Sequence, residues 1–131
     1  MPISSILNLF GGSDRITAEE LKAMMESKED ISIIDVRNPD EFSSGHIPGC
    51  VLIPLSELEG AEDIPSKGRL VLYCRSGVRS MKALNVLKGR GVKDAVDLKG
   101  GIEAWKNAGG PCRTGKVESS GNGIDMEKGT F

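Results

Sequence analysis

Short continuous apolar runs alternate along this chain with segments in which apolar residues recur every three or four positions. The continuous runs predict buried β-strands at residues 31–34, 51–53, 70–73 and 95–98. The segments with helical spacing predict helices at residues 17–25, 39–42, 55–58, 81–88 and 102–105. Strands that are apolar throughout and alternate with helices are typical of a parallel sheet. The pattern therefore predicts an α/β fold whose parallel sheet is flanked by helices on both faces.

Polar residues mark the starts of two of these helices. Thr17, followed three positions later by Glu20, predicts a capping box. Asn38 is the second expected N-cap, with Pro39 at the first helical position and Glu41 at the third. These signals predict where both helices begin.

The most informative stretch runs from Cys74 to Ser80, between the strand at 70–73 and the helix at 81–88. A loop in this position can aim backbone N–H groups at an anion, and the helix N-terminus adds a partial positive charge. Both effects favour the thiolate form of Cys74. Gly77 suits a turn that needs a positive φ, and we expect the Arg79 cation to face the bound anion. The stretch predicts a nucleophilic cysteine with an anion cradle.

Some polar residues at the strand ends admit more than one interpretation. A lone cysteine at a strand end is often inert packing, and the glycine and arginines of the loop are what favour a reactive Cys74. Asp35 directly follows the strand at 31–34. It therefore lies at the carboxyl ends of the parallel strands, where such sheets bind ligands. Asp35 and Arg37 either shape the floor of a pocket there or form a buried pair that fixes the fold.

Composition and charge exclude several function classes. The 131 residues are 38% hydrophobic and 27% charged, which describes one soluble globular domain. A net charge of −2 argues against a nucleic-acid partner. No apolar stretch reaches the roughly 18–20 residues of a membrane span, and the N-terminus lacks the basic flank and long apolar core of a secretory signal. We therefore expect a cytoplasmic protein with no membrane partner.

The three cysteines, Cys50, Cys74 and Cys112, include no closely spaced pair. Zinc sites need such pairs, and a disulfide framework needs more cysteines. We expect reduced thiols, no metal and no cofactor. Cys50 is interpreted as a small apolar filler at the start of a strand, and a resolving role for Cys112 is the less favoured interpretation.

The apolar pattern fades after Pro111, and residues 113–131 contain mainly Gly, Ser and charged residues. Such a composition does not bury enough apolar surface to fold by itself. The sequence therefore predicts an N-terminal extension at 1–15, one domain at 16–112 and a flexible C-terminal tail at 113–131.

Four motifs in order carry a resemblance to a known family. They are residues 33–37 followed by 40–42, residues 45–49, the loop that begins at Cys74, and residues 98–105. Together they resemble a single-domain rhodanese over most of the chain. The resemblance implies a five-stranded parallel sheet and a sulfurtransferase. In that family the loop cysteine takes a sulfane sulfur from a donor as a persulfide and passes it to a thiophilic acceptor.

The resemblance also implies roles for individual residues. Cys74 matches the cysteine that carries the persulfide, and the loop that cradles it is matched by Arg75, Ser76, Gly77, Val78 and Arg79. Four residues separate Cys74 from Arg79, which is the spacing of the sulfurtransferases. The related cell-division phosphatases have one residue more, so dephosphorylation is the weaker enzymatic interpretation. His46 matches a position that is mainly structural in the family.

The donor and acceptor are only partly indicated. Ser76 and Glu41 stand where thiosulfate-using relatives often carry basic residues, so the donor is expected to be thiosulfate or a persulfide, including a protein persulfide. A thioredoxin-like protein is an expected acceptor, and the chain is expected to be a monomer or a weak homodimer. The alternative to an enzyme is a non-catalytic rhodanese-like module that binds a partner or senses redox state.

Overall fold

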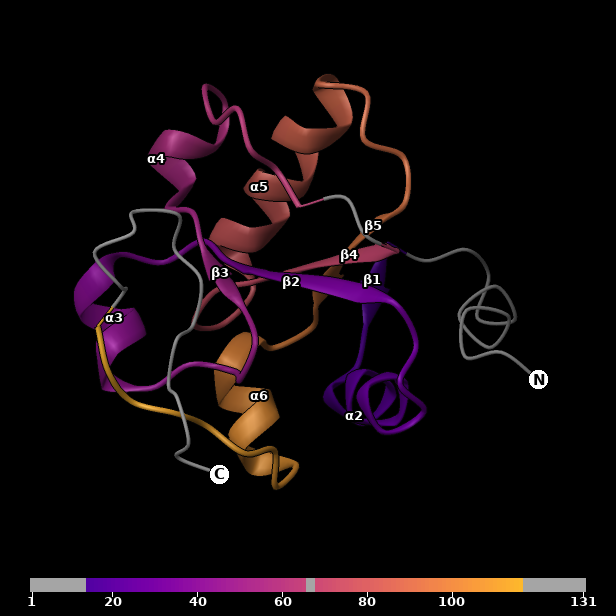
Figure 1. The fold of residues 1–131 in the computed structure, drawn as a ribbon, viewed down its shortest axis with the longest axis vertical. Helices are drawn as coiled ribbons and strands as arrows, with labels where there is room; N and C mark the ends of the chain where they lie inside the picture. The colour runs from indigo at the N-terminus through magenta and orange to yellow at the C-terminus, as the bar shows by residue number, and fades with distance from the viewer. Residues whose placement is uncertain (1–13, 66–67, 117–131) are drawn as a thin grey trace.

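The computed structural model describes residues 14–65 and 68–116 (Figure 1). Its five parallel strands form one sheet in the order β1-β5-β4-β2-β3. The strands are β1 (Arg15–Ile16), β2 (Ile31–Asp35), β3 (Val51–Leu52), β4 (Arg69–Tyr73) and β5 (Ala95–Leu98). This architecture confirms the predicted α/β fold with five parallel strands.

Helices cover both faces of the sheet, as predicted. They are α2 (Ala18–Glu26), α3 (Pro39–Ser44), α4 (Leu55–Leu58), α5 (Val78–Gly89) and α6 (Gly101–Asn107). Figure 1 shows α4 and α5 on one face and α2 and α6 on the other. None of the helices in residues 14–65 and 68–116 is long and apolar enough to span a membrane.

The side chains of the central strand β4 alternate between these two layers. Val71 and Tyr73 pack in the core on the α2 and α6 side, whereas Leu70, Leu72 and Cys74 pack in the core on the α4 and α5 side. Cys74 thus continues the alternation one residue past the carboxyl end of β4. This places its side chain under the start of α5.

Both predicted capping boxes are present. The Thr17 hydroxyl accepts a hydrogen bond from the Glu20 amide at 3.1 Å, and the Glu20 carboxylate accepts one from the Thr17 amide at 2.7 Å. Asn38 and Glu41 make the same reciprocal pair at the start of α3, with Pro39 at its first position. The signals that predict these helix starts lie within one helical turn, and both helices begin directly after the predicted cap residues.

Two features differ from the apolar pattern. The pattern does not indicate β1, because this two-residue strand has one apolar residue and is defined by its pairing with β5. Helical spacing groups Met81 with Leu84 and Leu87, yet Met81 is 46% exposed and the two leucines are buried. Met81 lies in the first turn of α5 beside the exposed Val78, at the rim of the Cys74 loop.

Most of the predicted extension (1–15) and tail (113–131) lies outside the described residues, so these boundaries stay predictions. At the edges that are described, Arg15 belongs to β1, and Arg113 is buried. The Arg113 backbone exchanges two hydrogen bonds with that of His46, both at 2.8 Å. Among the described residues, Arg15 is therefore paired in the sheet and the Arg113 backbone is paired with that of His46.

Candidate active site

The Cys74 loop directs backbone amides at the cysteine sulfur. The Gly77 amide lies 3.1 Å from Cys74 Sγ and the Ser80 amide lies 3.4 Å from it. Gly77 has a φ of 113°, and a Cβ there would lie 2.8 Å from the Arg15 guanidinium. The positive φ is what favours glycine at this turn, because the Arg15 guanidinium is the end of a flexible side chain that could shift. Two backbone amides thus point at a sulfur that is almost completely buried, an arrangement that can stabilise negative charge there.

These contacts change the acidity of Cys74. Burial alone raises the pKa of a thiol, but the hydrogen bond with the Ser80 side chain and those from the Ser80, Gly77 and Ser76 amides outweigh it. The pKa of Cys74 is therefore lower than that of an ordinary cysteine. A lowered thiol pKa and a sulfur at the mouth of a strand-loop-helix unit are the features of a nucleophilic cysteine.

The loop is also held from the side of α6. The Ile102 amide donates to the Cys74 carbonyl at 2.9 Å, and the Glu103 amide donates to the Arg75 carbonyl at 3.3 Å. A Cβ on Gly101 would lie 2.4 Å from the Arg75 carbonyl oxygen. The second glycine of the Gly100-Gly101 pair is thus required for this close approach, which orients the loop carbonyls away from the sulfur.

Arg79 is paired with a carboxylate that the sequence does not identify as its partner. Its guanidinium makes a two-pronged pair with Glu41 of α3, with nitrogen-to-oxygen distances of 2.7 and 2.9 Å. Glu41 is also the capping carboxylate of α3, since it accepts from the Asn38 amide at 3.2 Å. Arg79 therefore joins the first turn of α5 to α3, and its charge is balanced by a carboxylate before any anion binds.

The Arg79 pair predicts a pH-dependent contribution to stability. The hydrogen bond from Arg79 is the main reason that the pKa of Glu41 falls from its ordinary value of 4.5 to about 2. The lower folded-state pKa means that the pair stabilises the fold above about pH 4.5 and that this stabilisation is lost as the pH falls toward 2. Glu41→Gln should lower the free energy of unfolding by about 1 kcal/mol at neutral pH, because the pair is partly exposed.

Denaturant unfolding of both proteins across this pH range measures that difference, which should shrink as the pH falls. The matched control is Glu103→Gln, because Glu103 pairs with Arg75 at 2.9 Å on the surface, where both side chains are more than half exposed. The control should change stability less than Glu41→Gln does. A Glu41→Gln effect that is the same at low and neutral pH would contradict the prediction.

The side chains of the other predicted loop residues, Arg75, Ser76 and Val78, are on the surface. Arg75 and Ser76 are exposed, and Val78 is 64% exposed. Arg75 donates to the Glu103 carboxylate, so it too is paired. These three side chains are exposed at the rim, and the contacts with the sulfur come from the Gly77 and Ser80 amides and from the Ser80 hydroxyl.

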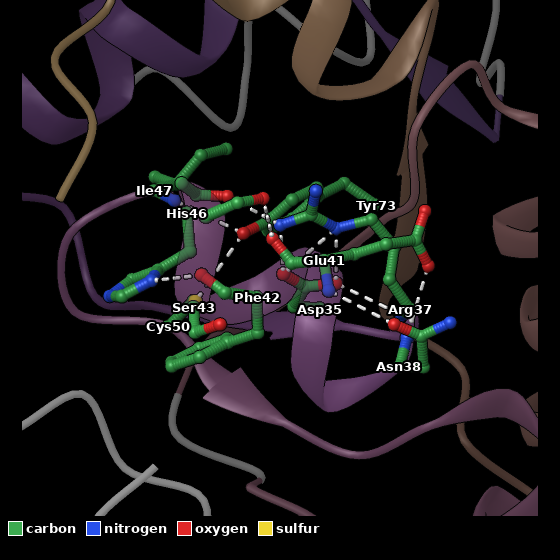
Figure 2. Close-up of polar contacts among 12 residues, drawn as sticks. Asp35, Arg37, Asn38, Glu41, Phe42, Ser43, His46, Ile47, Cys50 and Tyr73 are labelled. Carbon is green, nitrogen blue, oxygen red and sulfur yellow. Dashed lines mark hydrogen bonds and ion pairs between the residues drawn. The ribbon is translucent and has the colours of Figure 1, made fainter. Parts of the chain in front are cut away.

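Asp35 and Arg37 form a buried ion pair next to α3 (Figure 2). The Asp35 carboxylate accepts from the Arg37 amide and from two guanidinium nitrogens, at 2.7 to 3.1 Å. The same guanidinium donates to the Gly45 carbonyl at 2.7 Å and lies 5.5 Å from the centre of the Tyr73 ring. The pair thus joins the end of β2 to the end of α3, which favours the fold-fixing role of the two that the sequence leaves open.

His46, Cys50 and Cys112 lie outside the cysteine loop. The buried His46 ring stacks on Phe42 with centroids 3.8 Å apart, and its Nδ1 lies 2.8 Å from the Phe42 carbonyl oxygen (Figure 2). Cys50 is buried with its sulfur 3.5 Å from the Tyr73 hydroxyl, and Cys112 is exposed. These positions agree with a structural histidine and with Cys50 as a core filler.

Sequence reasoning assigns no role to two buried polar residues behind the sulfur. Ser80 Oγ lies 3.5 Å from Cys74 Sγ and donates its proton to Asp97 Oδ1. The other Asp97 oxygen accepts from Arg15 Nε at 2.8 Å. A signal does exist for Asp97, because it is the one charged residue in the apolar run of β5, and β5 is the neighbour of β4.

The sequence and the fold of this chain both match known proteins. Residues 17–108 match the Rhodanese-like domain family. A protein from Mycobacterium tuberculosis named "Probable adenylyltransferase/sulfurtransferase MoeZ" is 45% identical over 93 residues, which are 69% of this chain and 24% of that protein. The chain thus spans about a quarter of the length of this relative.

Two further relatives match over most of their length. A protein named sulfurtransferase from Allochromatium vinosum is 34% identical over 99 residues, which are 75% of this chain and 92% of that protein. The solution structure of the rhodanese-like domain of the Anabaena Alr3790 protein has a TM-score of 0.73 and 28% identity, and the match covers 86% of this chain and 88% of that one. The motifs, the fold and these matches agree, and the chain therefore belongs to the family of rhodanese-like sulfurtransferases.

Proposed function

We propose that this protein moves a sulfane sulfur from a donor to a thiophilic acceptor through a persulfide on Cys74. The observation that carries the proposal is the pair of backbone amides, from Gly77 and Ser80, that point at the buried Cys74 sulfur at 3.1 and 3.4 Å. Amides in a fixed loop stabilise negative charge on sulfur without reorganisation during the reaction.

The chemistry has two steps. The Cys74 thiolate attacks the outer sulfur of a thiosulfate or persulfide donor, so that a new S–S bond forms at Cys74 Sγ and the S–S bond of the donor breaks. The electron pair of the broken bond leaves with sulfite or with a thiolate. A nucleophilic acceptor then attacks the terminal sulfur of the persulfide, and Cys74 leaves as a thiolate. Loop amides favour the negative charge at both stages.

The charges at the rim favour a persulfide over thiosulfate as the donor. Both loop arginines are paired with carboxylates, Arg79 with Glu41 and Arg75 with Glu103. Thiosulfate brings two negative charges on its reacting group and has to compete with these carboxylates, whereas the reacting group of a persulfide carries at most one negative charge. A small or protein-bound persulfide is therefore the donor that this rim fits better.

Intact mass spectrometry tests the function directly. The protein is incubated with thiosulfate or with glutathione persulfide and then treated with a dithiol reductant. We expect the mass of one sulfur atom to be added, more readily from the persulfide, and then removed by the dithiol. Absence of added sulfur from both donors would overturn the proposed function and leave a non-catalytic binding module as the interpretation.

Rim charge predicts the effect of one substitution on thiosulfate use. Ser76→Lys should lower the KM for thiosulfate about threefold at low ionic strength, because it adds one exposed cation near the incoming dianion. The benefit should shrink as added salt screens the charge. Steady-state kinetics with cyanide as the acceptor measure both effects.

The matched control for this substitution is Ser27→Lys. Ser27 is exposed and precedes β2, so it lies at the opposite end of the parallel sheet from Cys74. The control adds the same charge and should leave the KM unchanged. Equal KM values for Ser76→Lys and the unsubstituted protein at low ionic strength would show that rim charge does not govern donor choice.

A further inference from the structure

Ser80 connects the Cys74 sulfur to a buried carboxylate, and we propose that Asp97 accepts the proton of the Cys74 thiol through the Ser80 hydroxyl. The inference rests on the proposed function, because it concerns the sulfur that forms the persulfide. It makes Ser80 a proton relay and Asp97 the residue that stores the proton while the sulfur is charged or bonded to sulfane sulfur.

The three side chains form a continuous path from three elements of the fold. Cys74 follows β4, Ser80 lies in the first turn of α5, and Asp97 belongs to β5. Ser80 Oγ lies 3.5 Å from Cys74 Sγ and donates to Asp97 Oδ1. Ser80 and Asp97 are completely buried and Cys74 is 1% exposed. The path through Ser80 to Asp97 is therefore shielded from bulk water, and it is the path that the side chains provide for the thiol proton.

The number of protons on Ser80 sets the direction of its hydrogen bonds. A serine hydroxyl has one proton to donate and two lone pairs that accept. When this proton points to the Asp97 carboxylate, Ser80 accepts from the Cys74 thiol and does not donate to it. Ser80 stabilises the Cys74 thiolate only when its proton points to sulfur, and this requires that Asp97 carry a proton of its own. Ionisation of Cys74 is therefore coupled to protonation of Asp97.

The transfer balances in atoms and charge. The thiol proton of Cys74 passes to Ser80 Oγ while the hydroxyl proton of Ser80 passes to Asp97 Oδ1. Ser80 is neutral before and after, the sulfur gains one negative charge, and the carboxylate loses one. In the second half of the sulfur transfer Cys74 leaves as a thiolate, and the same proton returns from Asp97 through Ser80. No oxidant, reductant or metal takes part.

Interactions at the two ends of the path shift the proton affinities of the sulfur and the carboxylate toward one another. Burial raises the pKa of Asp97, against the hydrogen bonds from Ser80 and Arg15 that lower it. The amides of Gly77 and Ser80 favour the charge on sulfur, and Arg15 of β1 favours the charge on Asp97. Arg15 is the charged side chain that contacts Asp97 among the described residues, and β4 places the apolar Leu72 in register with it. These interactions reduce the difference in proton affinity between the sulfur and the carboxylate, as a transfer between them requires.

A shared proton gives a distinctive pH profile. The thiol with a carboxylate and the thiolate with a carboxylic acid hold the same number of protons, so their ratio does not change with pH. The reactivity of Cys74 should therefore reach a plateau once the pair has lost its first proton, and it should rise again at higher pH when the second proton leaves. A cysteine that ionises alone gives a single sigmoidal rise.

Alkylation of Cys74 by iodoacetamide measures this profile without any sulfur donor. The rate is followed across pH by mass spectrometry of the peptide that contains Cys74, so that Cys50 and Cys112 do not contribute. We expect a plateau in the unsubstituted protein and a single sigmoid in Asp97→Asn. On the plateau the Asp97→Asn rate should be lower by roughly a hundredfold, the lower end of the range for a positioned proton acceptor.

Two serine variants keep the test valid if Asp97→Asn does not fold. Ser80→Ala interrupts the path but keeps Asp97, Arg15 and the amide of residue 80, and it should lose the plateau. Ser80→Thr retains a hydroxyl and should restore it. A single sigmoid in the unsubstituted protein would overturn the proposal, as would a plateau that persists in Ser80→Ala.

The outcome is independent of the proposed function. Alkylation needs no persulfide, so the plateau can be present in a protein that never accepts sulfur. Conversely, sulfur addition measured by intact mass, combined with a single sigmoidal alkylation profile, would keep the sulfurtransferase and remove the relay.

Discussion

Replacement of Cys74 with serine is expected to abolish the addition of sulfane sulfur to the protein. Cys74 is the cysteine whose sulfur receives the Gly77 and Ser80 amides, and its pKa is lowered by these hydrogen bonds and by Ser80. A serine hydroxyl is a far weaker nucleophile toward sulfur and forms no stable persulfide analogue. Intact mass after incubation with a persulfide donor should show no added sulfur in Cys74→Ser.

The other two cysteines supply the controls for this prediction. Cys50→Ala and Cys112→Ala should both retain the added sulfur, because Cys50 is buried beside Tyr73 and Cys112 is exposed outside the loop. Folding of each variant is checked by circular dichroism. Sulfur that still adds to folded Cys74→Ser would show that another cysteine carries the persulfide.

The parts of the fold that the sequence predicts are those with local signals. The capping pairs Thr17 with Glu20 and Asn38 with Glu41 lie within one helical turn, so spacing alone identifies them. The apolar run of β4 is continuous because this strand is buried on both faces, and the runs at 31–34 and 95–98 each contain one polar residue, Ser32 and Asp97. The Cys74 loop is also local, since its strand, glycine and helix start follow one another in the chain.

Pairings between distant residues could not be predicted in the same way. Arg79 and Glu41 are 38 positions apart, and Arg15 and Asp97 are 82 positions apart. Their partners are fixed by the strand order, which places β1 beside β5 and brings α3 close to the start of α5. The sequence of the Cys74 loop predicts that Arg79 lies near the anion site. Only the packing of α3 shows that its guanidinium is already paired with the Glu41 carboxylate. The buried path from Cys74 to Asp97 depends on the same strand order.

The buried pair of Asp35 and Arg37 is expected to have the largest effect on stability. Arg37→Met leaves the fully buried Asp35 carboxylate without its guanidinium partner and leaves the Gly45 carbonyl without its donor. Loss of one member of a buried ion pair costs about 3–5 kcal/mol, because the remaining charge stays buried and unpaired. Denaturant unfolding should therefore show a loss of this size. The matched control is Arg75→Met, whose exposed pair with Glu103 is worth at most about 1 kcal/mol.

The double variant Asp35→Asn with Arg37→Met separates the two roles that the sequence leaves open. If the pair fixes the fold, removing both charges should recover part of the stability lost in Arg37→Met, because no buried charge remains unpaired. Sulfur addition to Cys74 should then be retained in the folded double variant, since the Arg37 guanidinium makes its hydrogen bonds with Asp35 and Gly45. If the pair forms the floor of the donor pocket, the double variant should fold and yet lose sulfur addition. Stability and intact mass measured on the same samples therefore decide between a structural pair and a substrate-binding pair.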